Sequence, residues 1–568
     1  MEITIKLDSP KKLSSNILVK QSGYVSCSYN SDVVDYIRNL PIRAYHPNTK
    51  EWEINSNEVA TFCNKFTDHE ITLIGVYEKR EEELAEIPPD FEFKTKPFAH
   101  QIDGVRYGLT HGNFLLGDDQ GLGKTKQIID LSNILRSQGK IKRTLIVCGV
   151  NSLKYNWQAE IETHSNEKSW VIGTRTRKNG KKYEGSAKDR LADLDNLPNV
   201  SFLITNIETL RLGAYKEGKK RIFPFVDKLQ KLIDGGEIGV IALDESHKLK
   251  NPTSLQGMAC LKLKAPYMIP MSGTFLMNSP LDMYFPLKWA GFVEKSFYAF
   301  KNHYCKLGGF GGHEVVGHKN LNEIRDILDQ CMLRRLKTEV LDLPEKLHQN
   351  EYVEMTSKQA IIYKEVHNMV LSEINQIKFS DNPLAMLIRL RQATGYTGIL
   401  SDSIQESAKL DRMVELVEEL TSNGQKAVIF SNWGSITSQA KKRLKEYAPA
   451  YITGQTNASE RMLEVNRFQN DNKCKVIIGT LGAMGTGLTL TAGQTVIFLD
   501  EPWNRALRDQ AEDRCHRIGT KGTVNIITLI CKNTIDERIN NLVRKKGEMA
   551  DAIVDGKLSN EDINYLLM

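Results

Sequence analysis

The sequence predicts an α/β protein with two tandem, doubly wound parallel-sheet lobes, helical insertions and a small N-terminal α+β module. Three observations support this fold class. Short apolar segments alternate with longer helical stretches from about residue 95, and a second such series begins after about residue 405. The apolar segments are continuous valine, isoleucine and leucine runs, which fit strands buried on both faces of a sheet. The length of 568 residues suits about four units of roughly 150 residues each.

The N-terminal module is expected over residues 1–85. Its segment IRAYHPNTKEWEI predicts two strands joined by a turn at the Pro-Asn pair. Tyr45 and Trp52 lie at strand spacing, so they are candidates for the core of a small β domain as much as for a binding surface. An acidic, proline-containing stretch over 78–92 predicts a linker or a short exposed helix.

Four further segments are expected along the rest of the chain. The first lobe is expected over 95–340, with a helical insertion at about 280–340 and strands in NFLLGD, RTLIVCGV, SFLITN and IGVIALDE. A helical protrusion or linker over 341–404 should lead to the second lobe, 405–540, with strands in AVIFSNW, PAYITG, KVIIGT, TVIFLDE and TVNIITLI. A C-terminal helical segment is expected over 541–568.

Charge, cysteine content and hydrophobicity narrow the class of protein. The net charge of +6, from 76 basic and 70 acidic residues, is too small to predict nucleic-acid binding by itself. The nine cysteines include no C-x-x-C pair, so neither a disulfide framework nor a structural zinc site is expected. The sequence has no secretory signal and no apolar run near the ~18 residues of a membrane span. We therefore expect no membrane association and an intracellular protein, in the cytoplasm or nucleoid of a bacterial or phage source or in a eukaryotic nucleus.

A glycine-rich loop follows the first expected strand of the first lobe and leads directly into a helix. Its residues are Asp118, Asp119, Gln120, Gly121, Leu122, Gly123, Lys124 and Thr125. Glycines let backbone N–H groups surround phosphate oxygens, and the helix N-terminus adds a favourable dipole. Lys124 is expected to reach the β- and γ-phosphates of ATP, and Thr125 to hold Mg²⁺. The general pattern has glycine where this chain has Asp118, so a glycine-rich turn with a surface lysine is the alternative.

An acidic motif ends the fourth expected strand of this lobe. Asp244 and Glu245 follow the segment IGVIAL, at the strand end where ligands bind in such sheets. Asp244 can hold Mg²⁺ directly or through water, and Glu245 can orient and polarise the attacking water. His247 is a candidate for sensing the γ-phosphate. A surface strand end is the alternative, which the position about 120 residues after the phosphate loop makes weaker.

The two motifs, with further segments over about 95–540, resemble the SWI/SNF-type ATPases of helicase superfamily two. That family writes its phosphate loop D-E-x-G-L-G-K-T, so Asp118 occupies the usual first position and Asp119 replaces glutamate. DESHKLKNPTS resembles the family's extended acidic motif, and QAEDRCHRIGT resembles its last ATPase motif. The resemblance implies two RecA-like lobes that share one site for ATP and Mg²⁺.

The resemblance also implies which residues form that site. Arg514 and Arg517 would reach the γ-phosphate across the cleft, where arginine fingers typically contribute about 10³–10⁵ in rate. Gln101, in PFAHQIDGV, would read the adenine. The implied catalytic residues are Lys124, Asp244, Glu245, Arg514 and Arg517. The implied nucleotide-binding residues are Gln101, Asp118, Gly121, Leu122, Gly123, Lys124, Thr125, Gly485 and Gln510, with Thr125 and Asp244 as the Mg²⁺ ligands.

Coupling residues and DNA contacts are implied in the same way. MSGTFLMNSPLDMY resembles the segment that couples the two lobes, although Phe275 replaces the family's proline. The implied coupling residues are His247, Ser272, Gly273 and Thr274. The implied DNA contacts are Ser152, Lys154, Thr205, Asn206, Ser431, Asn432, Trp433 and Thr480. Such contacts go to the phosphate backbone and are nearly independent of base sequence.

The short segment YHPNTKEWEI resembles the HARP-type repeat that precedes the motor in annealing helicases. It implies that Arg43, Tyr45, Lys50 and Trp52 recognise forked or branched DNA. The expected function is a monomeric, DNA-stimulated ATPase that translocates on duplex DNA and remodels forks in replication or repair. Three alternatives stay open: a remodeller that displaces proteins from DNA, an RNA helicase, and a scaffold whose motor no longer works.

Overall fold

The computed structural model describes most of the chain. The described residues are 2–7, 22–28, 30–40, 43–55, 59, 62–63, 65–74, 84–151, 153–176, 182–218, 220–275, 279–309, 311–312, 314–341, 343–376, 383–485, 488–502, 505–517, 519–520 and 522–546. Among these residues, no helix is long and apolar enough to cross a bilayer.

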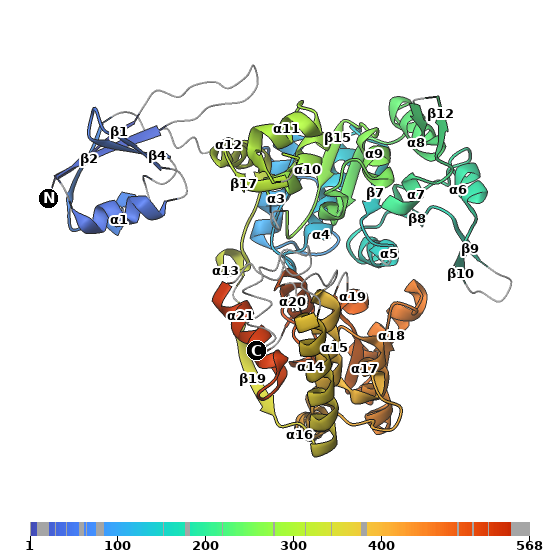
Figure 1. Ribbon diagram of the computed structural model, residues 1–568. Helices are drawn as coiled ribbons and strands as arrows, with labels where there is room; N and C mark the ends of the chain where they lie inside the picture. The colour runs from blue at the N-terminus through green and yellow to red at the C-terminus, as the bar shows by residue number, and fades with distance from the viewer. Residues whose placement is uncertain are drawn as a thin grey trace.

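The N-terminal module contains a five-stranded sheet with a helix packed on it, drawn in blue in Figure 1. The strand order is β3-β4-β2-β1-β5. The elements are β1 (Glu2–Leu7), β2 (Ser22–Cys27), α1 (Ser31–Asn39), β3 (Arg43–His46), β4 (Glu51–Asn55) and β5 (Glu70–Ile74). β3 and β4 are the two strands predicted in IRAYHPNTKEWEI, and their antiparallel register places Tyr45 opposite Trp52. Ile5, Val33 and Ile54 belong to the apolar core between sheet and helix.

The first lobe is built on a five-stranded parallel sheet in the order β15-β14-β7-β11-β8. Its strands are β7 (Thr144–Cys148), β8 (Ser169–Val171), β11 (Phe202–Asn206), β14 (Val240–Asp244) and β15 (Tyr267–Pro270). Alternate side chains of β7 enter two different cores, since Leu145 and Val147 lie in one and Ile146 and Cys148 in the other. Both faces of the sheet are therefore buried, which confirms the doubly wound fold predicted from the continuous apolar runs.

The strand before the phosphate loop is short and lies beside the main sheet. β6 (Leu115–Leu116) pairs in parallel with β18 (Met332–Leu333), and a single bridge joins Leu116 to Met271 just after β15. The phosphate loop therefore begins between the first sheet and the segment that leaves the first lobe.

The second lobe is built on a six-stranded parallel sheet in the order β19-β24-β23-β20-β22-β21. Its strands are β19 (Lys346–Val353), β20 (Ala427–Ser431), β21 (Ala450–Ile452), β22 (Val476–Thr480), β23 (Thr495–Phe498) and β24 (Val524–Cys531). The strands β20 to β24 are those predicted from the sequence. Val428 and Phe430 point into one core and Ala427 and Ile429 into another, so this lobe is also doubly wound.

β19 lies within residues 341–404, where a helical protrusion or linker was expected. This strand pairs with β24 along its full length and forms one edge of the second sheet. Most side chains of β19 are at least partly exposed, and its sequence, KLHQNEYV, is accordingly polar. It therefore lacks the apolar run that predicts a buried strand. The helices α14 (Ser357–Gln376) and α15 (Pro383–Gly395) agree with the expectation for the rest of this segment.

Helices cover both sheets, and hairpins extend from the first lobe. The helices of the first lobe are α3 (Ala99–His111), α4 (Lys124–Ser137), α5 (Leu153–His164), α6 (Ala187–Asp193), α7 (Ile207–Leu210), α8 (Pro224–Asp234), α9 (Leu255–Leu261), α10 (Tyr284–Trp289), α11 (Phe297–Tyr304), α12 (Leu321–Cys331) and α13 (Lys337–Val340). Those that follow β20 are α17 (Gly434–Arg443), α18 (Ala458–Asn470), α19 (Leu481–Met484), α20 (Arg505–Glu512) and α21 (Ile535–Lys546), and α16 (Ala408–Ser422) precedes it. The hairpins pair β9 (Thr174–Thr176) with β10 (Lys182–Glu184), β12 (Tyr215–Glu217) with β13 (Lys220–Ile222), and β16 (Cys305–Gly308) with β17 (Glu314–His318).

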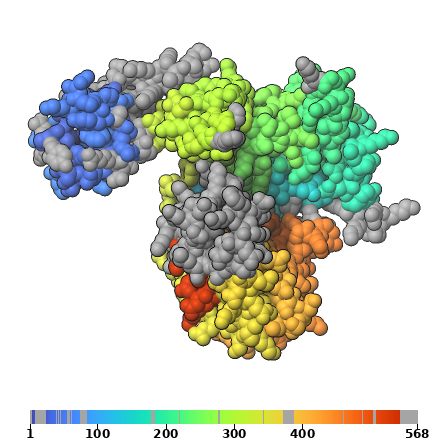
Figure 2. Space-filling view, in the orientation of Figure 1, coloured from blue at the N-terminus to red at the C-terminus, as the bar shows by residue number. Residues whose placement is uncertain are grey.

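The two lobes are stacked, with α19 and α20 at the top of the second lobe beneath α4 and α5 of the first (Figure 1). In the space-filling view the cyan-to-green first lobe rests on the yellow-to-orange second lobe (Figure 2). The carboxyl ends of the strands in the first sheet, where Asp244 lies, face this junction.

Candidate nucleotide site between the lobes

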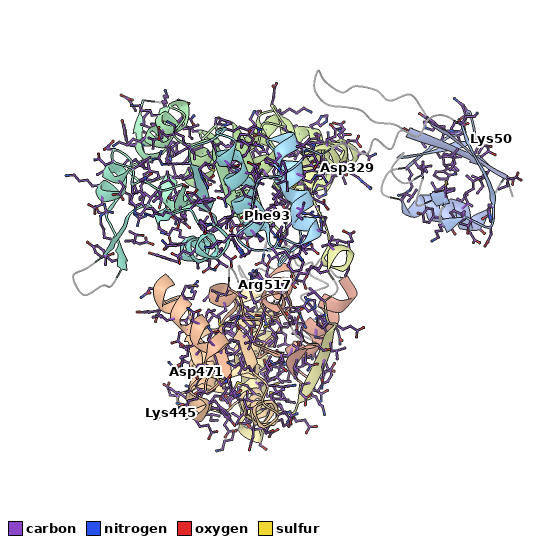
Figure 3. The ribbon with its side chains drawn as sticks, turned by 180° about the vertical axis from the view of Figure 1, so that it is seen from behind. Lys50, Phe93, Asp329, Lys445, Asp471 and Arg517 are labelled. Carbon is purple, nitrogen blue, oxygen red and sulfur yellow. The ribbon has the colours of Figure 1, made fainter. Side chains whose placement is uncertain are left out.

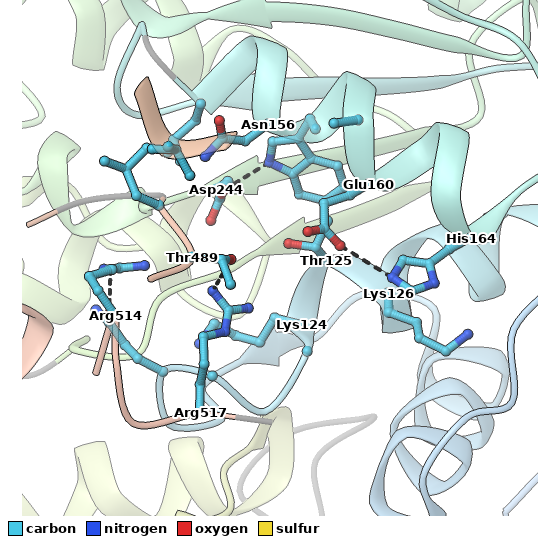
Figure 4. A pocket seen from close by; sticks show the side chains of 18 of the residues that line it. Lys124, Thr125, Lys126, Asn156, Glu160, His164, Asp244, Thr489, Arg514 and Arg517 are labelled. Carbon is cyan, nitrogen blue, oxygen red and sulfur yellow. Dashed lines mark hydrogen bonds and ion pairs between the residues drawn. The ribbon is translucent and has the colours of Figure 1, made fainter. Parts of the chain in front are cut away.

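A cavity of about 490 Å³ lies between the two lobes, and residues of both lobes line it. Nine of the predicted site residues are among them. These are Gln101, Gly121, Gly123, Lys124, Thr125, Asp244, Glu245, Arg514 and Arg517. Figure 4 labels five of them, Lys124, Thr125, Asp244, Arg514 and Arg517. The structure therefore brings together motifs that lie nearly 400 residues apart in the sequence.

The phosphate loop wraps around the N-terminus of α4. Gly121 and Gly123 have positive φ angles of 89° and 77°, a backbone form that favours glycine. Lys124 begins α4, and its Nζ donates to the carbonyl oxygens of Asp118 at 2.7 Å and Asp119 at 3.2 Å. Burial lowers the pKa of Lys124, and the carboxylate of Glu245 opposes that shift. A half-buried ammonium at a helix N-terminus suits an anionic phosphate group.

Asp118 supports the loop from inside the first lobe. Its side chain is fully buried and does not line the cavity. The carboxylate accepts hydrogen bonds from Arg335 Nε at 3.0 Å and from Gln127 Nε2 at 2.9 Å. Leu122 is also buried, and its carbonyl accepts hydrogen bonds from His100 and Gln101. These two predicted nucleotide-binding residues therefore shape the loop, and their side chains do not face the cleft.

Asp244 is held by two donors at the end of β14. Its Oδ2 accepts a hydrogen bond from Trp157 Nε1 at 2.8 Å, and its Oδ1 accepts one from the backbone N–H of Glu245 at 2.9 Å. Burial, together with the charge of Glu245, raises the pKa of Asp244 to about 6. A bound cation favours the ionised carboxylate, and Mg²⁺ prefers oxygen ligands such as this carboxylate and the Thr125 hydroxyl. The donor set therefore fits a Mg²⁺ ion.

Glu245 adopts a left-handed backbone conformation with φ of 51°, which is uncommon outside glycine. Gly149 makes room for it, since a Cβ there would lie 2.7 Å from the Glu245 carbonyl oxygen. Glu245 Oε2 lies 3.2 Å from His247 Nδ1 but makes no hydrogen bond within the described residues. Burial lowers the pKa of His247 to about 4, so at neutral pH the imidazole is uncharged and this contact is not an ion pair.

The predicted coupling residues form a continuous set behind Glu245. His247 Nδ1 and the Ser272 hydroxyl are hydrogen-bonded at 3.0 Å, and the same hydroxyl accepts from the backbone N–H of Thr274 at 3.0 Å. Gly273 packs directly on the phosphate loop, where a Cβ would lie 2.6 Å from Gln120 Cγ. The acidic motif, the segment after β15 and the phosphate loop are therefore in mutual contact.

The two predicted arginines enter the cavity from the second lobe. Arg514 Nη2 donates to Gln120 Oε1 of the phosphate loop at 2.7 Å, and its Nε donates to the Gly485 carbonyl at 3.1 Å. Arg517 Nη1 donates to Thr489 Oγ1 at 2.9 Å, at the junction of the lobes (Figure 3). Burial and the neighbouring Arg517 lower the pKa of Arg514 to about 10, so it stays charged at neutral pH.

The remaining predicted nucleotide-binding residues differ in their position relative to the cavity. Gln101 lines the cavity, and its amide is held between the Phe98 backbone N–H, at 3.1 Å, and the Leu122 carbonyl, at 3.2 Å. Gly485 contributes the carbonyl that holds Arg514. Gln510 is buried and does not line the cavity.

Several lining residues were missed by the sequence analysis. Glu160 and His164 lie on α5 and are paired at 3.2 Å, and His164 also contacts Thr95 Oγ1 at 2.6 Å. With Trp157 they follow the spacing of one helix face, which is the signal that could have found them. The second lobe adds Met462, Val465, Asn466 and Gln469 of α18. The sequence of α18 contains no pattern that predicts these residues as part of the cavity, because they reach it only through contact between the lobes.

The described residues among the predicted DNA contacts of the first lobe are buried. Ser152 lies outside the described residues. Lys154 is 1% exposed, and its Nζ pairs with Glu184 at 2.7 Å. Thr205 and Asn206 are buried at the end of β11. None of these described side chains lines the cavity.

The predicted DNA contacts of the second lobe gather at the carboxyl ends of β20 and β22. Asp500 accepts hydrogen bonds from the Ser431 hydroxyl and, at 3.0 Å, from the Asn432 backbone N–H. The Trp433 ring lies 5.1 Å from the Arg391 guanidinium. Thr480 is the N-cap of α19. They lie at the carboxyl-terminal ends of two interior strands of the second sheet, and none of them lines the nucleotide cavity.

The predicted residues of the N-terminal module lie on β3, β4 and their turn. Tyr45 is 47% exposed and its ring packs 4.9 Å from that of half-buried Trp52, which also contacts the module's core. Lys50 occupies the turn with φ of 56°, and Arg43 donates to the Leu40 carbonyl. In the aromatic pair, Trp52 contacts the core and Tyr45 is exposed. The pair therefore fits both a core role and a binding surface.

Two parallel-sheet lobes, with a phosphate loop in the first and arginines from the second reaching it, define a two-lobed nucleotide-binding protein. Family comparison assigns residues 69–397 to the SNF2-related domain and residues 408–519 to the helicase conserved C-terminal domain. The chain therefore belongs to the SNF2-related family, as its motifs predicted.

Relatives of known name agree with this family. The chain is 28% identical over 480 residues to an uncharacterized ATP-dependent helicase of Mycoplasma pneumoniae, covering 82% of this chain and 42% of that protein. It is 27% identical over 487 residues to the human DNA annealing helicase and endonuclease ZRANB3, covering 83% of this chain and 41% of that protein. A Drosophila melanogaster SWI/SNF-related regulator of chromatin, subfamily A-like protein 1, is 25% identical over 552 residues, with 92% and 66% covered.

The chain thus spans less than half the length of the first two relatives. Among solved structures, it is similar to the Sulfolobus solfataricus SWI2/SNF2 ATPase core in complex with dsDNA, with 23% identity and a TM-score of 0.36 over 85% of this chain and 99% of that chain.

Proposed function

We propose that the chain is a DNA-stimulated ATPase that hydrolyses ATP with Mg²⁺ between its lobes and translocates on duplex DNA. The observation that carries this proposal is the hydrogen bond from Arg514 of the second lobe to Gln120 in the phosphate loop of the first. A nucleotide site built from two lobes changes its geometry whenever the lobes move, and that link between chemistry and motion is what a motor requires. The helicase names of the relatives support the same class of activity.

The chemistry follows from the placement of the lining residues. The phosphate loop and Lys124 would bind the β- and γ-phosphates, and Thr125 and Asp244 would hold Mg²⁺, which neutralises phosphate charge when bound. Glu245 Oε2 is free of hydrogen bonds within the described residues and can accept one from the attacking water. Glu245 takes the proton as the water oxygen bonds to the γ-phosphorus and the bond to the ADP oxygen breaks.

The arginines act on the leaving phosphoryl group. Arg514 and Arg517 carry positive charge at the cavity and would donate to the γ-phosphoryl oxygens as negative charge develops on them. In the structure Arg514 Nη2 already bonds Gln120 of the phosphate loop, and the guanidinium has further N–H groups that can donate to phosphoryl oxygens. The hydrogen bonds from His247 through Ser272 to Thr274 would pass the state of the γ-phosphate to the segment after β15.

Fork remodelling is the finer part of the proposal. It is supported by the exposed Tyr45 on the N-terminal module and by the annealing-helicase relative. We also propose the division into an N-terminal module, two lobes, a linker and a C-terminal segment expected from the sequence, with β19 added to the second lobe. The DNA-contact residues stay a proposal, because Lys154 must leave Glu184 before it can reach a phosphate.

The proposal is tested by measuring ATP turnover of the full chain with single-stranded, duplex and forked DNA and with duplex RNA, at one stated salt concentration. Duplex DNA should raise the rate above the basal value, and forked DNA should raise it further. Failure of every DNA ligand to stimulate turnover would contradict the proposal, and stronger stimulation by RNA would favour an RNA helicase.

A further inference from the structure

We propose that Lys337 is a positioning residue that ties the arginine-bearing segment of the second lobe to the phosphate loop of the first. Residues 333–337, here called the strap, leave the first lobe directly beside the phosphate loop. Lys337 ends the strap and contacts both the loop and the segment that carries Arg514 and Arg517. The inference rests on the proposed ATPase function, because positioning the arginines matters only if they act on a nucleotide.

The strap follows the phosphate loop through backbone hydrogen bonds. Gly117 N–H donates to the Leu333 carbonyl at 2.7 Å, and Asp119 N–H donates to the Arg335 carbonyl at 3.0 Å. Lys337 N–H then donates to the Asp119 carboxylate at 3.1 Å. Hydrogen bonds therefore join alternate residues of the loop to alternate residues of the strap, so a shift of the loop displaces the strap.

The strap is anchored at its middle by a buried ion pair. Arg335 donates to both oxygens of Asp118, whose side chain has no exposure. The same guanidinium donates to Gln127 Oε1 at 3.0 Å and to the His100 carbonyl. The anchor fixes the strap against α3 and α4, so Lys337 projects from a rigid base.

The side chain of Lys337 crosses from the first lobe to the second. Its Nζ donates to the His516 carbonyl at 2.9 Å and pairs with Asp513 at 2.8 Å, and both partners flank Arg514. Its Cε lies 3.3 Å from where a Cβ on Gly121 would be, and Arg517 Cβ lies 2.9 Å from the same point. Lys337 and Arg517 thus both pack against Gly121 of the phosphate loop.

The charge of Lys337 is part of this arrangement. Its side chain is 11% exposed and that of Asp513 is 14% exposed, so water screens the pair only weakly. Burial lowers the pKa of Lys337 to about 8, while Asp513 opposes the shift. The charged and titratable groups that face Lys337 are Asp119 on the phosphate loop, Lys346 at the start of β19, and Asp513, His516 and Arg517 after α20.

The experiment compares three variants of the full chain. Lys337→Met keeps the length of the side chain and removes its charge, whereas Lys337→Arg keeps the charge with a much higher pKa. Lys426→Met is the matched control, because Lys426 is also a largely buried lysine that caps carbonyls, those of Phe468 and Asp471, and it does not line the cavity. Duplex-stimulated kcat, KM for ATP and direct binding of a fluorescent ATP analogue are measured for each.

We expect Lys337→Met to lower kcat by about 10–100-fold, the loss typical of misplaced catalytic groups, with analogue binding within about threefold of the parent chain. Lys337→Arg should restore most of kcat, and Lys426→Met should leave kcat unchanged. The kcat of the parent chain should fall as pH rises through about 8, where Lys337 loses its charge, and the Lys337→Arg variant should lack that fall.

Two results would overturn the inference. One is a kcat for Lys337→Met within about twofold of the active parent chain; the other is an equal loss of kcat and analogue binding, the mark of a merely structural role. If Lys337→Met does not fold, Asp513→Asn tests the same contact, and its kcat must fall while binding persists. A parent chain that turns over no ATP would instead contradict the proposed function itself.

Discussion

At the residue scale, the carboxylates at the end of β14 are prepared for two different tasks. Asp244 is fixed by Trp157 and by the Glu245 backbone, so both of its oxygens have set directions. Glu245 is strained in its backbone and leaves one carboxylate oxygen without a donor among the described residues. A carboxylate oriented by one donor on each oxygen keeps lone pairs for a metal ion, and an oxygen without a donor can accept a hydrogen bond from water.

The Glu245→Gln variant tests whether Glu245 accepts the proton of the attacking water. The amide cannot take a proton, so turnover should fall by about 10²–10⁴-fold, the usual contribution of a general base. Binding of a fluorescent ATP analogue should persist, because the phosphate loop is intact. Glu237→Gln, an equal change on a side chain that pairs with Lys142 away from the cleft, serves as control. Near-normal turnover in Glu245→Gln would remove Glu245 from the proposed chemistry.

The Trp157→Phe variant tests whether Asp244 is oriented to hold Mg²⁺. It removes the donor that orients Asp244, so the Mg²⁺ concentration that half-saturates turnover should rise. Trp289→Phe is a matched control, because Trp289 is equally buried and its Nε1 donates to the Cys260 carbonyl instead. In the parent chain the Mg²⁺ requirement should also rise as pH falls through about 6, where Asp244 takes up a proton. An unchanged Mg²⁺ requirement in Trp157→Phe would contradict this role.

At the element scale, strands and loops differ in how far the sequence predicts them. β7, β14, β20 and β23 were predicted because both faces of each are buried, which leaves a continuous apolar run. β19 was missed because an edge strand with exposed side chains has no such run. The phosphate loop and acidic motif were predicted from local patterns, whereas the contacts that α18 and the strap make at the cleft were not, since these contacts are non-local.

The strap's anchor gives a prediction about stability. Arg335→Met leaves the buried Asp118 carboxylate without its ion-pair partner, which typically costs about 3–5 kcal/mol. Lys142→Met breaks the exposed pair with Glu237 and should cost about 0–1 kcal/mol. Thermal or denaturant unfolding of the two variants checks this difference. Equal destabilisation would mean that Arg335 does not fix the strap.

At the scale of the whole molecule, two lobes share one site while a separate module lies N-terminal to them. Residues 84–86 contact α3, since Arg106 bonds to Leu84, Ala85 and Glu86. A deletion of residues 2–74 therefore removes the module's sheet and leaves this contact in place. None of the described residues of the module lines the cavity, so its contribution should depend on the form of the DNA.

Deleting residues 2–74 should spare ATP turnover with plain duplex DNA and reduce turnover and strand annealing with forked DNA. The double variant Tyr45→Ala with Trp52→Ala tests the exposed aromatic pair alone, with an unfolding curve to show that the module still folds. Equal loss on duplex and forked DNA would mean that the module supports folding and does not recognise forks.

The central claim is that the nucleotide site is completed by the second lobe. The most direct measurement is duplex-stimulated ATP turnover and ATP-analogue binding in Arg514→Ala, which removes a side chain now bonded to the phosphate loop. A shared site predicts that turnover falls by about 10³-fold or more while analogue binding changes far less. Turnover equal to that of the parent chain would contradict the claim, because the first lobe would then hydrolyse ATP without the second.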